Sequence, residues 1–239
     1  IAKQWARDLV GTKFDSKQIM KEYLPHRNNQ GMQGFVFNLR NPLFQDRRVR
    51  AALGMAFDFE WANNKLFFNE YTRSASYFSN SDLAAKNLPE GLELEYLLPF
   101  KDQLPPEVFT QQLTPFSTGP LNTLRDNLRN AKKILAEAGW TVQDGRLINK
   151  EGNSFDFEIL LVSPSFERVM AGYVNNLKKL GVNASYRTID PALYIDRLNR
   201  FDFDMTVHVF GQSQSPGNEQ RDYWHSSSAD RNGSRNLIG

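Results

Sequence analysis

The sequence predicts an α/β domain built on a mixed, mostly parallel sheet flanked by helices and joined by long irregular loops. The strongest indication is the alternation of strand, helix, strand, helix and strand between residues 155 and 210. Elements at this spacing form right-handed βαβ crossovers, which place the connected strands parallel. An amphipathic helix over residues 123–140 and an alternating apolar strand over residues 32–39 precede this series.

The first half of the chain contains few regular elements. A short helix is expected near residues 5–10, and the alternation of apolar residues predicts a strand at 32–39. Asp46 is a suitable N-cap, so a helix is expected over residues 46–68. Residues 69–120 are rich in proline and predict a long irregular region, which either has a function or wraps another part of the protein.

The second half reads as a regular series. The helix over 123–140 is expected to stop at Gly139, because glycine commonly follows the last helical residue. Turn glycines predict a small hairpin next. The expected elements are a hairpin at 144–155, a strand at 155–162, a helix at 166–180, a strand at 183–189, a helix opened by Asp190-Pro191, and a strand at 201–210.

The composition excludes several classes of function. The 239 residues contain no cysteine, which excludes disulfides, thiolate metal sites and a cysteine nucleophile. The 29 basic and 27 acidic side chains are too balanced to indicate a nucleic-acid partner. The three histidines lack metal-type spacing, and no nucleotide-binding glycine motif or serine-nucleophile motif is present. We therefore expect no cofactor, no metal, no nucleic acid and no enzymatic activity.

Two polar loops follow strands of the predicted parallel sheet, at 163–166 and at 211–224. Ligands of open α/β sheets bind beyond the carboxyl ends of the strands, so both loops are candidate binding segments. Each contains a Ser-Pro pair and an aromatic residue, which offer hydroxyl partners beside a stacking face. The alternative is that 211–224 only caps the sheet, with Tyr223 and Trp224 as core anchors.

Four stretches in order resemble the family 5 solute-binding proteins of ABC transporters, of the oligopeptide- and dipeptide-binding type. They are NPLFQDRRVRAALGMAFD (41–58), NLRNAKKILAEAGW (127–140), VNNLKKLGVNASYRTID (174–190) and FDFDM (201–205). SPGNEQRDYW and SRNLIG are similar to a YejA-like branch, associated with uptake of peptides and peptide-nucleotide conjugates.

The resemblance implies a periplasmic-binding-protein-like lobe (type II, cluster C) from a two-lobed protein. Residues 1–32 would then be a hinge-proximal segment from the first lobe, 33–225 the second ligand-binding lobe, and 226–239 the chain crossing back. It also implies a periplasmic, monomeric binding component of an ABC importer that works with membrane permease subunits and releases a peptide or peptide-like ligand unchanged. Two alternatives stay open: a fragment of an α/β peptide-processing enzyme with its catalytic residues elsewhere, and a sensory ligand-binding domain.

The resemblance also selects candidate ligand-binding residues around the two loops. Many peptide-binding members supply an Asp for the free α-amine after the last strand, whereas Gly211, Gln212 and Ser213 occupy that region here. A neutral site of this kind suits an N-blocked peptide or a ligand held by backbone hydrogen bonds. The candidate ligand-binding residues are Gln212, Ser213, Ser215, Asn218, Glu219, Trp224, Tyr77, Phe78 and Ser163. Tyr77 and Phe78 come from a third polar stretch, 71–82, whose equivalent lies near the cleft in this family; the alternative for them is packing against the preceding helix.

Overall fold

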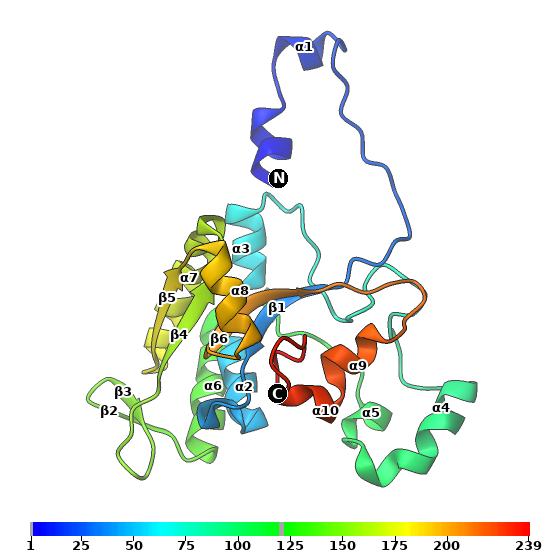
Figure 1. Ribbon diagram of the computed structural model, residues 1–239. Coiled ribbons are helices and arrows are strands. Elements are labelled where there is room, and N and C mark those ends of the chain that lie inside the picture. Colours follow the sequence, from blue (N-terminus) through cyan, green and yellow to red (C-terminus); the bar gives the residue numbers. More distant parts are fainter. Residues whose placement is uncertain (1, 120–121) are drawn as a thin grey trace.

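The computed structural model describes residues 2–119 and 122–239 (Figure 1). Residues 1, 120 and 121, which fall in the predicted hinge-proximal segment and in the connection before the helix at 123–140, lie outside the described residues. None of the described helices has the length and apolar character needed to cross a bilayer. The strands are β1 Met32–Phe37, β2 Thr141–Gln143, β3 Arg146–Ile148, β4 Asp156–Leu161, β5 Asn183–Thr188 and β6 Met205–Phe210. The α-helices are α1 Thr12–Asp15, α2 Arg47–Met55, α3 Phe59–Leu66, α4 Gly91–Leu97, α5 Glu107–Thr110, α6 Leu124–Glu137, α7 Glu167–Lys179, α8 Pro191–Asn199, α9 Glu219–Trp224 and α10 Ser226–Ala229.

The main sheet has four strands in the order β1-β6-β4-β5. β4 is parallel to both β5 and β6, whereas β1 runs antiparallel to β6 along the whole of both strands. This confirms the predicted mixed, mostly parallel sheet flanked by helices. The ladder between β4 and β6 is short, with only Ile159↔Met205 and Leu160↔Thr206 paired. β6 therefore continues beyond β4 with β1 as its partner.

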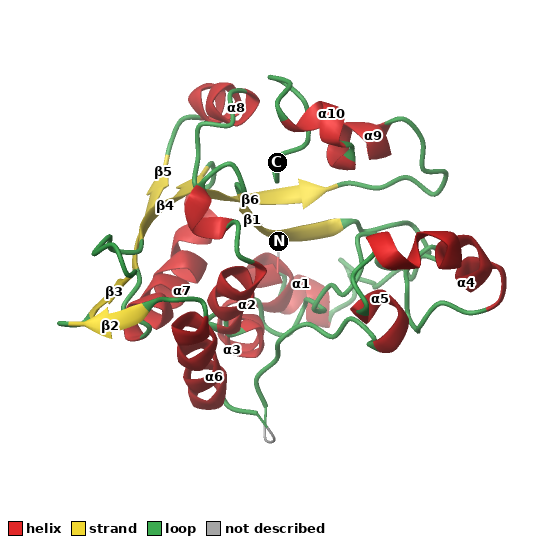
Figure 2. Cartoon of the chain, turned by 90° about the horizontal axis from the view of Figure 1, so that it is seen from below, coloured by secondary structure: helices red, strands yellow, loops and turns green. Residues whose placement is uncertain are grey.

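The two crossovers place helices on opposite faces of the sheet (Figure 2). The chain moves outward from β4 to β5 through α7 and then returns past β4 to β6 through α8. Because both crossovers are expected to be right-handed, a reversal of direction puts their helices on different faces. Ile159 and Leu161 accordingly face the larger core with α2, α6 and α7, whereas Leu160 faces the smaller core with α8 and α9.

The predicted helices at 123–140 and 166–180 are present as α6 and α7. Thr123 begins α6 with a capping box, in which its hydroxyl accepts from the Asp126 amide while the Asp126 carboxylate accepts from the Thr123 amide. Ala131 and Leu135 then face the core, as the apolar spacing of this segment predicts.

Three segments differ from expectation. The helix expected at 46–68 is split into α2 and α3, because the Asp58 carboxylate accepts from the Trp61 amide at 3.0 Å and begins a second helix. The hairpin expected at 144–155 is present in part, because Ile148 pairs with Ser154 across a turn that contains Gly152. A further strand, β2, precedes it and pairs with β3 across Asp144-Gly145, where both residues have positive φ. The irregular region contains the short helices α4 and α5.

Gly181 and Gly172 provide a matched test of the packing around α7. Gly181 has φ +86°, and a Cβ there would lie 2.9 Å from the Leu147 amide nitrogen. Gly181→Ala should therefore lower the free energy of unfolding by more than about 1 kcal/mol. Gly172 lies inside α7, and a Cβ there would make only an ordinary 3.5 Å contact with the Trp61 ring. Gly172→Ala should therefore raise the free energy of unfolding by about 0.5–1 kcal/mol. Urea unfolding measures both, and equal effects would contradict this account.

Asn38 ties the end of β1 to the segment before β6. Its side chain is 3% exposed and donates to the Phe201 and Phe203 carbonyls at 2.9 and 2.8 Å. Asn38→Ala leaves these carbonyls without their donor, so the free energy of unfolding should fall by roughly 3 kcal/mol. Asn130→Ala, at an exposed position of α6, is the control and should change it by less than about 0.5 kcal/mol. A small loss for Asn38→Ala in urea unfolding would show that other donors replace it.

Candidate functional site

The segment 211–224 leaves the carboxyl end of β6 as a loop and then forms α9 (Figure 1). Only residues 211–218 are therefore loop, and the last six residues of the predicted loop are helical. The Glu219 carboxylate accepts from the Gly217 amide at 2.8 Å and closes the turn before α9. This bond is the main reason that the pKa of the Glu219 carboxyl is lowered, so the group stays ionised at neutral pH.

The loop 211–218 is held against the chain that leads into β1. Asn29 Nδ2 donates to the Ser213 carbonyl at 2.6 Å, and Gln214 Nε2 donates to the Arg27 carbonyl at 3.2 Å. Gly31 permits this close approach, because a Cβ there would lie 2.3 Å from the Phe210 carbonyl oxygen. Two segments far apart in sequence thus form one surface beyond the end of β6.

An aromatic cluster, defined as Tyr77, Phe210, Tyr223 and Trp224, underlies this loop. The Trp224 ring stacks on Phe210 with centroids 5.2 Å apart, and Tyr77 meets the same two rings edge-on at 4.6 and 5.4 Å. Phe210 and Tyr223 are each 3% exposed, whereas Trp224 is 37% exposed. Burial raises the pKa of the Tyr77 phenol, which stays neutral. The cluster is a fixed apolar platform with one ring open to solvent.

His208 and Arg235 border the platform. The His208 ring lies 5.0 Å from Phe210, and Arg235 Nη1 donates to the Tyr223 hydroxyl at 3.3 Å. Burial, followed by the positive charge of Arg235, lowers the pKa of His208, which favours the neutral imidazole at pH 7. A guanidinium and a neutral histidine therefore lie beside the cluster.

Two glutamines connect the loop to the platform. Trp224 Nε1 donates to Gln220 Oε1 at 3.0 Å, and Gln220 Nε2 donates to Gln212 Oε1. Ser213 closes the loop on itself by donating its hydroxyl to the Ser215 carbonyl at 2.6 Å. The polar side chains of loop 211–218 are neutral hydroxyls and amides, and they lie beside the exposed face of Trp224 and the ionised Glu219 carboxylate at the start of α9.

The structure brings most of the predicted residues together. Gln212, Ser213, Ser215, Asn218 and Glu219 share one loop or its junction with α9, and Tyr77 and Trp224 belong to the aromatic cluster.

The other two candidates make local contacts instead. The Ser163 hydroxyl caps a short 3-10 turn by accepting from the Ser165 amide at 3.4 Å, and the Phe78 amide donates to the Ser76 hydroxyl at 3.1 Å. No hydrogen bond or ring contact within the described part of the chain joins either residue to the cluster. All nine stay predictions as ligand-binding residues.

Reasoning from the sequence missed Gln220, Phe210 and Asn29. Gln220 lies inside the predicted loop 211–224, and Phe210 ends an apolar strand, so the sequence around each of them gave a local signal. Asn29 contacts Ser213 across 184 positions of sequence, and nothing near it in the chain indicates that contact.

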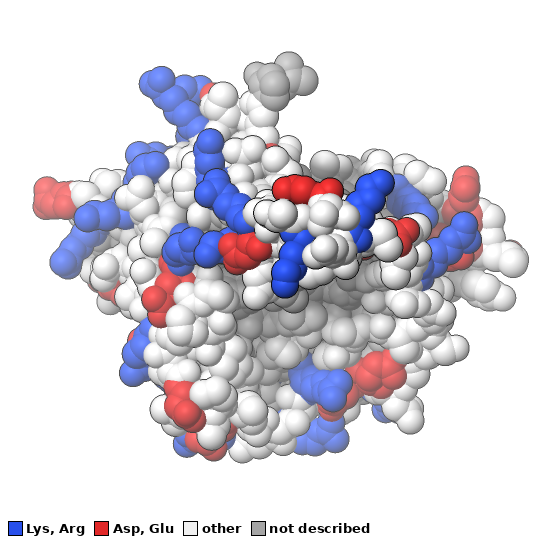
Figure 3. Space-filling model, turned by 90° about the horizontal axis from the view of Figure 1, so that it is seen from above, with Lys and Arg blue, Asp and Glu red and all other residues white. Residues whose placement is uncertain are grey.

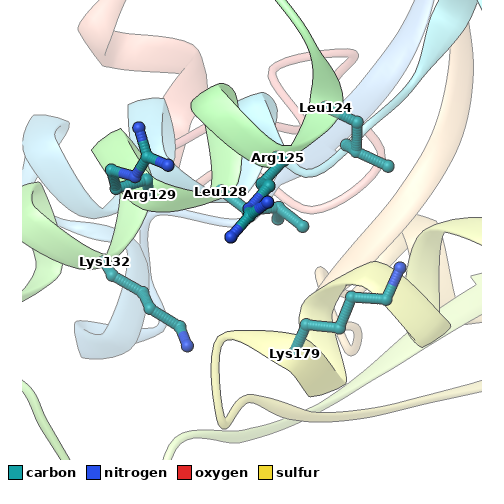
Figure 4. A pocket seen from close by; sticks show the side chains of 6 residues that line it. All are labelled: Leu124, Arg125, Leu128, Arg129, Lys132 and Lys179. Atoms are coloured by element: carbon teal, nitrogen blue, oxygen red, sulfur yellow. The ribbon is translucent and has the colours of Figure 1, made fainter.

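Two cavities lie away from this loop. A groove of about 460 Å³ is lined by Leu124 and Leu128 and by four cationic side chains, Arg125, Arg129, Lys132 and Lys179 (Figure 4). Among these cations, Arg129 is paired with Asp126 at 3.3 Å. Elsewhere acidic and basic groups are interspersed, as the face in Figure 3 shows.

The second cavity, of about 420 Å³, is polar and includes Asp202 and Asp204. Asp202 pairs with Arg197 at 3.0 Å, and Asp204 accepts from the Asn41 side chain at 2.8 Å and from the Glu158 amide at 3.0 Å. Both carboxylates are thus engaged in holding the segment before β6. Within residues 2–119 and 122–239, no group of three or more His, Asp or Glu side chains is arranged to hold a metal ion.

Several known proteins are similar to this chain in sequence or in fold. A probable peptide-binding protein YejA of Agrobacterium fabrum is 45% identical over 225 residues, which cover 93% of this chain and 37% of that protein. An uncharacterized protein y4wM of Sinorhizobium fredii is 46% identical over 244 residues, covering all of this chain and 36% of that protein. The chain thus spans little more than a third of the length of these relatives.

The oligopeptide-binding protein AppA of Bacillus subtilis, solved with a nonapeptide, superposes with a TM-score of 0.66 at 22% identity, covering 88% of this chain and 36% of AppA. This likeness confirms the predicted fold, a lobe of the type II periplasmic-binding-protein kind. The family described as bacterial extracellular solute-binding proteins, family 5 middle, matches residues 6–232. The chain therefore belongs to the family 5 bacterial extracellular solute-binding proteins.

Proposed function

We propose that the complete protein is the substrate-binding component of an ABC importer, which captures peptides or peptide-like conjugates between two lobes and releases them unchanged. The observation that carries the proposal is the polar loop 211–218 beside the exposed face of Trp224, at the carboxyl end of β6. Membership of a solute-binding family supports the proposal, as does the similarity to the probable peptide-binding protein YejA of A. fabrum. In this proposal the protein is a periplasmic monomer whose partners are membrane permease subunits.

The proposal assigns residues 33–225 to the second lobe, 1–32 to the hinge-proximal segment and 226–239 to the chain returning to the first lobe. Its support is the exposure of apolar side chains in the arm before β1, where Met20 is 81% and Leu24 75% exposed (Figure 1). Such side chains are expected to pack against another part of the protein. Arg40 holds the segment 226–239 against the end of β1 by donating to the Asn236 carbonyl at 2.9 Å.

The loop 211–218 has no acidic side chain of its own, which supports a ligand that does not depend on a free amine. The ionised Glu219 carboxylate follows the loop and accepts from the Gly217 amide. Loop hydroxyls and side-chain amides offer hydrogen bonds to a peptide backbone, and Trp224 offers a packing surface for a side chain.

Native mass spectrometry of the complete protein, purified without denaturation from its own periplasm, tests the binding function. We expect an added mass of peptide size that dissociates unchanged under mild activation. Conversion of added peptides into products would instead favour the α/β peptide-processing enzyme. Binding without import by a membrane permease would favour a sensory domain.

Ser213→Trp tests whether the loop lines the site. Ser213 is exposed, so the indole would project from the loop and obstruct the ligand, weakening affinity at least about tenfold, or roughly 1.4 kcal/mol. The free energy of unfolding should change by less than about 0.5 kcal/mol. Gln143→Trp, on the exposed hairpin of β2 and β3, is the matched control and should leave affinity unchanged. Calorimetric titration with the ligand recovered from the native protein measures both, and an unaltered affinity for Ser213→Trp removes the loop from the site.

A further inference from the structure

The hydrogen bonds from Trp224 to Gln212 have a defined direction. An indole nitrogen is only a donor, so the Gln220 amide must present its oxygen to Trp224 Nε1, 3.0 Å away. The Gln220 nitrogen then points to the other side, where Gln212 Oε1 and Glu219 Oε1 both accept from it. A carboxylate can only accept, so Glu219 supports the same orientation of the Gln220 amide.

This orientation leaves the Gln212 amide nitrogen at the end of the series as a donor. Gln212 Nε2 is shielded from solvent and has no hydrogen-bond partner among the residues that the structure describes. A buried donor without an acceptor is unfavourable, which makes this atom a site of unsatisfied hydrogen bonding.

A complementary unpaired atom, an acceptor, belongs to Asn29, whose side chain contacts the residue that follows Gln212. Asn29 Oδ1 is also shielded and without a partner within the described residues, while its Nδ2 donates to the carbonyl of Ser213, the residue next to Gln212. One donor and one acceptor are the two groups that a peptide amide satisfies through its carbonyl oxygen and its N–H. The solvent-exposed stretch 213–218 follows Gln212 directly, and its first residue is the one that Asn29 contacts, so both atoms lie beside the exposed part of the loop.

We propose that Gln220 is a positioning residue that sets the polarity of the site, turning the Gln212 amide so that its nitrogen donates to a carbonyl of a bound peptide while Asn29 Oδ1 accepts a peptide N–H. This inference rests on the proposed function. The preferred ligand group is a neutral amide. A protonated amine can donate to Asn29 Oδ1 but offers no acceptor to Gln212 Nε2, so it leaves that buried donor unsatisfied.

Gln220→Glu in the complete protein tests the direction of the hydrogen bonds. The introduced carboxylate still accepts from Trp224 Nε1 but cannot donate to Gln212, whose amide then turns over and presents its oxygen to the ligand. Gln143→Glu, on the exposed hairpin of β2 and β3, is the matched control, because it makes the same change of charge outside the binding loop and outside the series from Trp224 to Gln212.

The probes are tri-alanine and N-acetyl-tri-alanine, titrated calorimetrically into the parent protein and both variants. We expect the parent to bind the acetylated peptide at least tenfold more tightly than the free amine. Gln220→Glu should reduce that ratio at least tenfold, and Gln143→Glu should change it less than threefold. Melting temperatures measured in parallel separate a loss of selectivity from a loss of folding.

The two hypotheses fail in different ways. A parent protein that binds both peptides equally, or two variants with the same ratio, overturns the role of Gln220 and leaves the binding function intact. A parent that binds neither peptide overturns this inference, and the function itself fails only if the native protein also carries no ligand by mass spectrometry.

Discussion

The pairing of β6 with β1 is the constraint on which both the core and the site depend. β1 pairs with β6 along its full length, whereas β4 joins β6 through only two residue pairs. Its side chains alternate, so Met205 enters the larger core while Phe210 supports Trp224 on the opposite face. A slip of one residue would exchange the two faces and remove Phe210 from beneath Trp224. Gly31 protects this register, since any side chain there would meet the Phe210 carbonyl.

Much of the fold was predictable because its signals are local. The apolar spacing of α6 and α7 and the caps at Thr123 and Asp190 are visible within a few residues, and these elements lie where they were expected. The break at Asp58 was missed because the apolar pattern continues across it, although the same residue type predicted the start of α2 at Asp46. The hairpin was only partly placed because both glycines form turns: β2 and β3 pair across Gly145, and Ile148 pairs with Ser154 across Gly152. Strand order depends on tertiary pairing, which no local pattern encodes.

The candidate site was predictable only where it follows the chain. The loop after β6 was found because a polar, glycine-containing segment follows an apolar strand. Asn29 and Tyr77 reach that loop from distant segments, and only Tyr77 had been selected, through the family resemblance. Ser163 was selected because β4 and β6 are parallel, but parallel strands bring their following loops together only where the ladder extends to their ends. Here the ladder stops at Leu160 and Thr206, before either loop begins.

The ionisation of the groups around the loop favours reversible binding. The pKa of Glu219 is lowered and that of Tyr77 is raised, so neither exchanges a proton with a ligand near neutral pH. In the proposed function a ligand meets neutral hydroxyls and amides beside the ionised Glu219 carboxylate, and hydrogen bonds of the neutral groups contribute about 0.5–1.5 kcal/mol each when they replace bonds to water. Affinity must then be spread over many such contacts and must depend on excluding water from them. One lobe cannot exclude water by itself, as the 37% exposure of Trp224 shows, and closure of a second wall over this ring would strengthen the contacts beneath it.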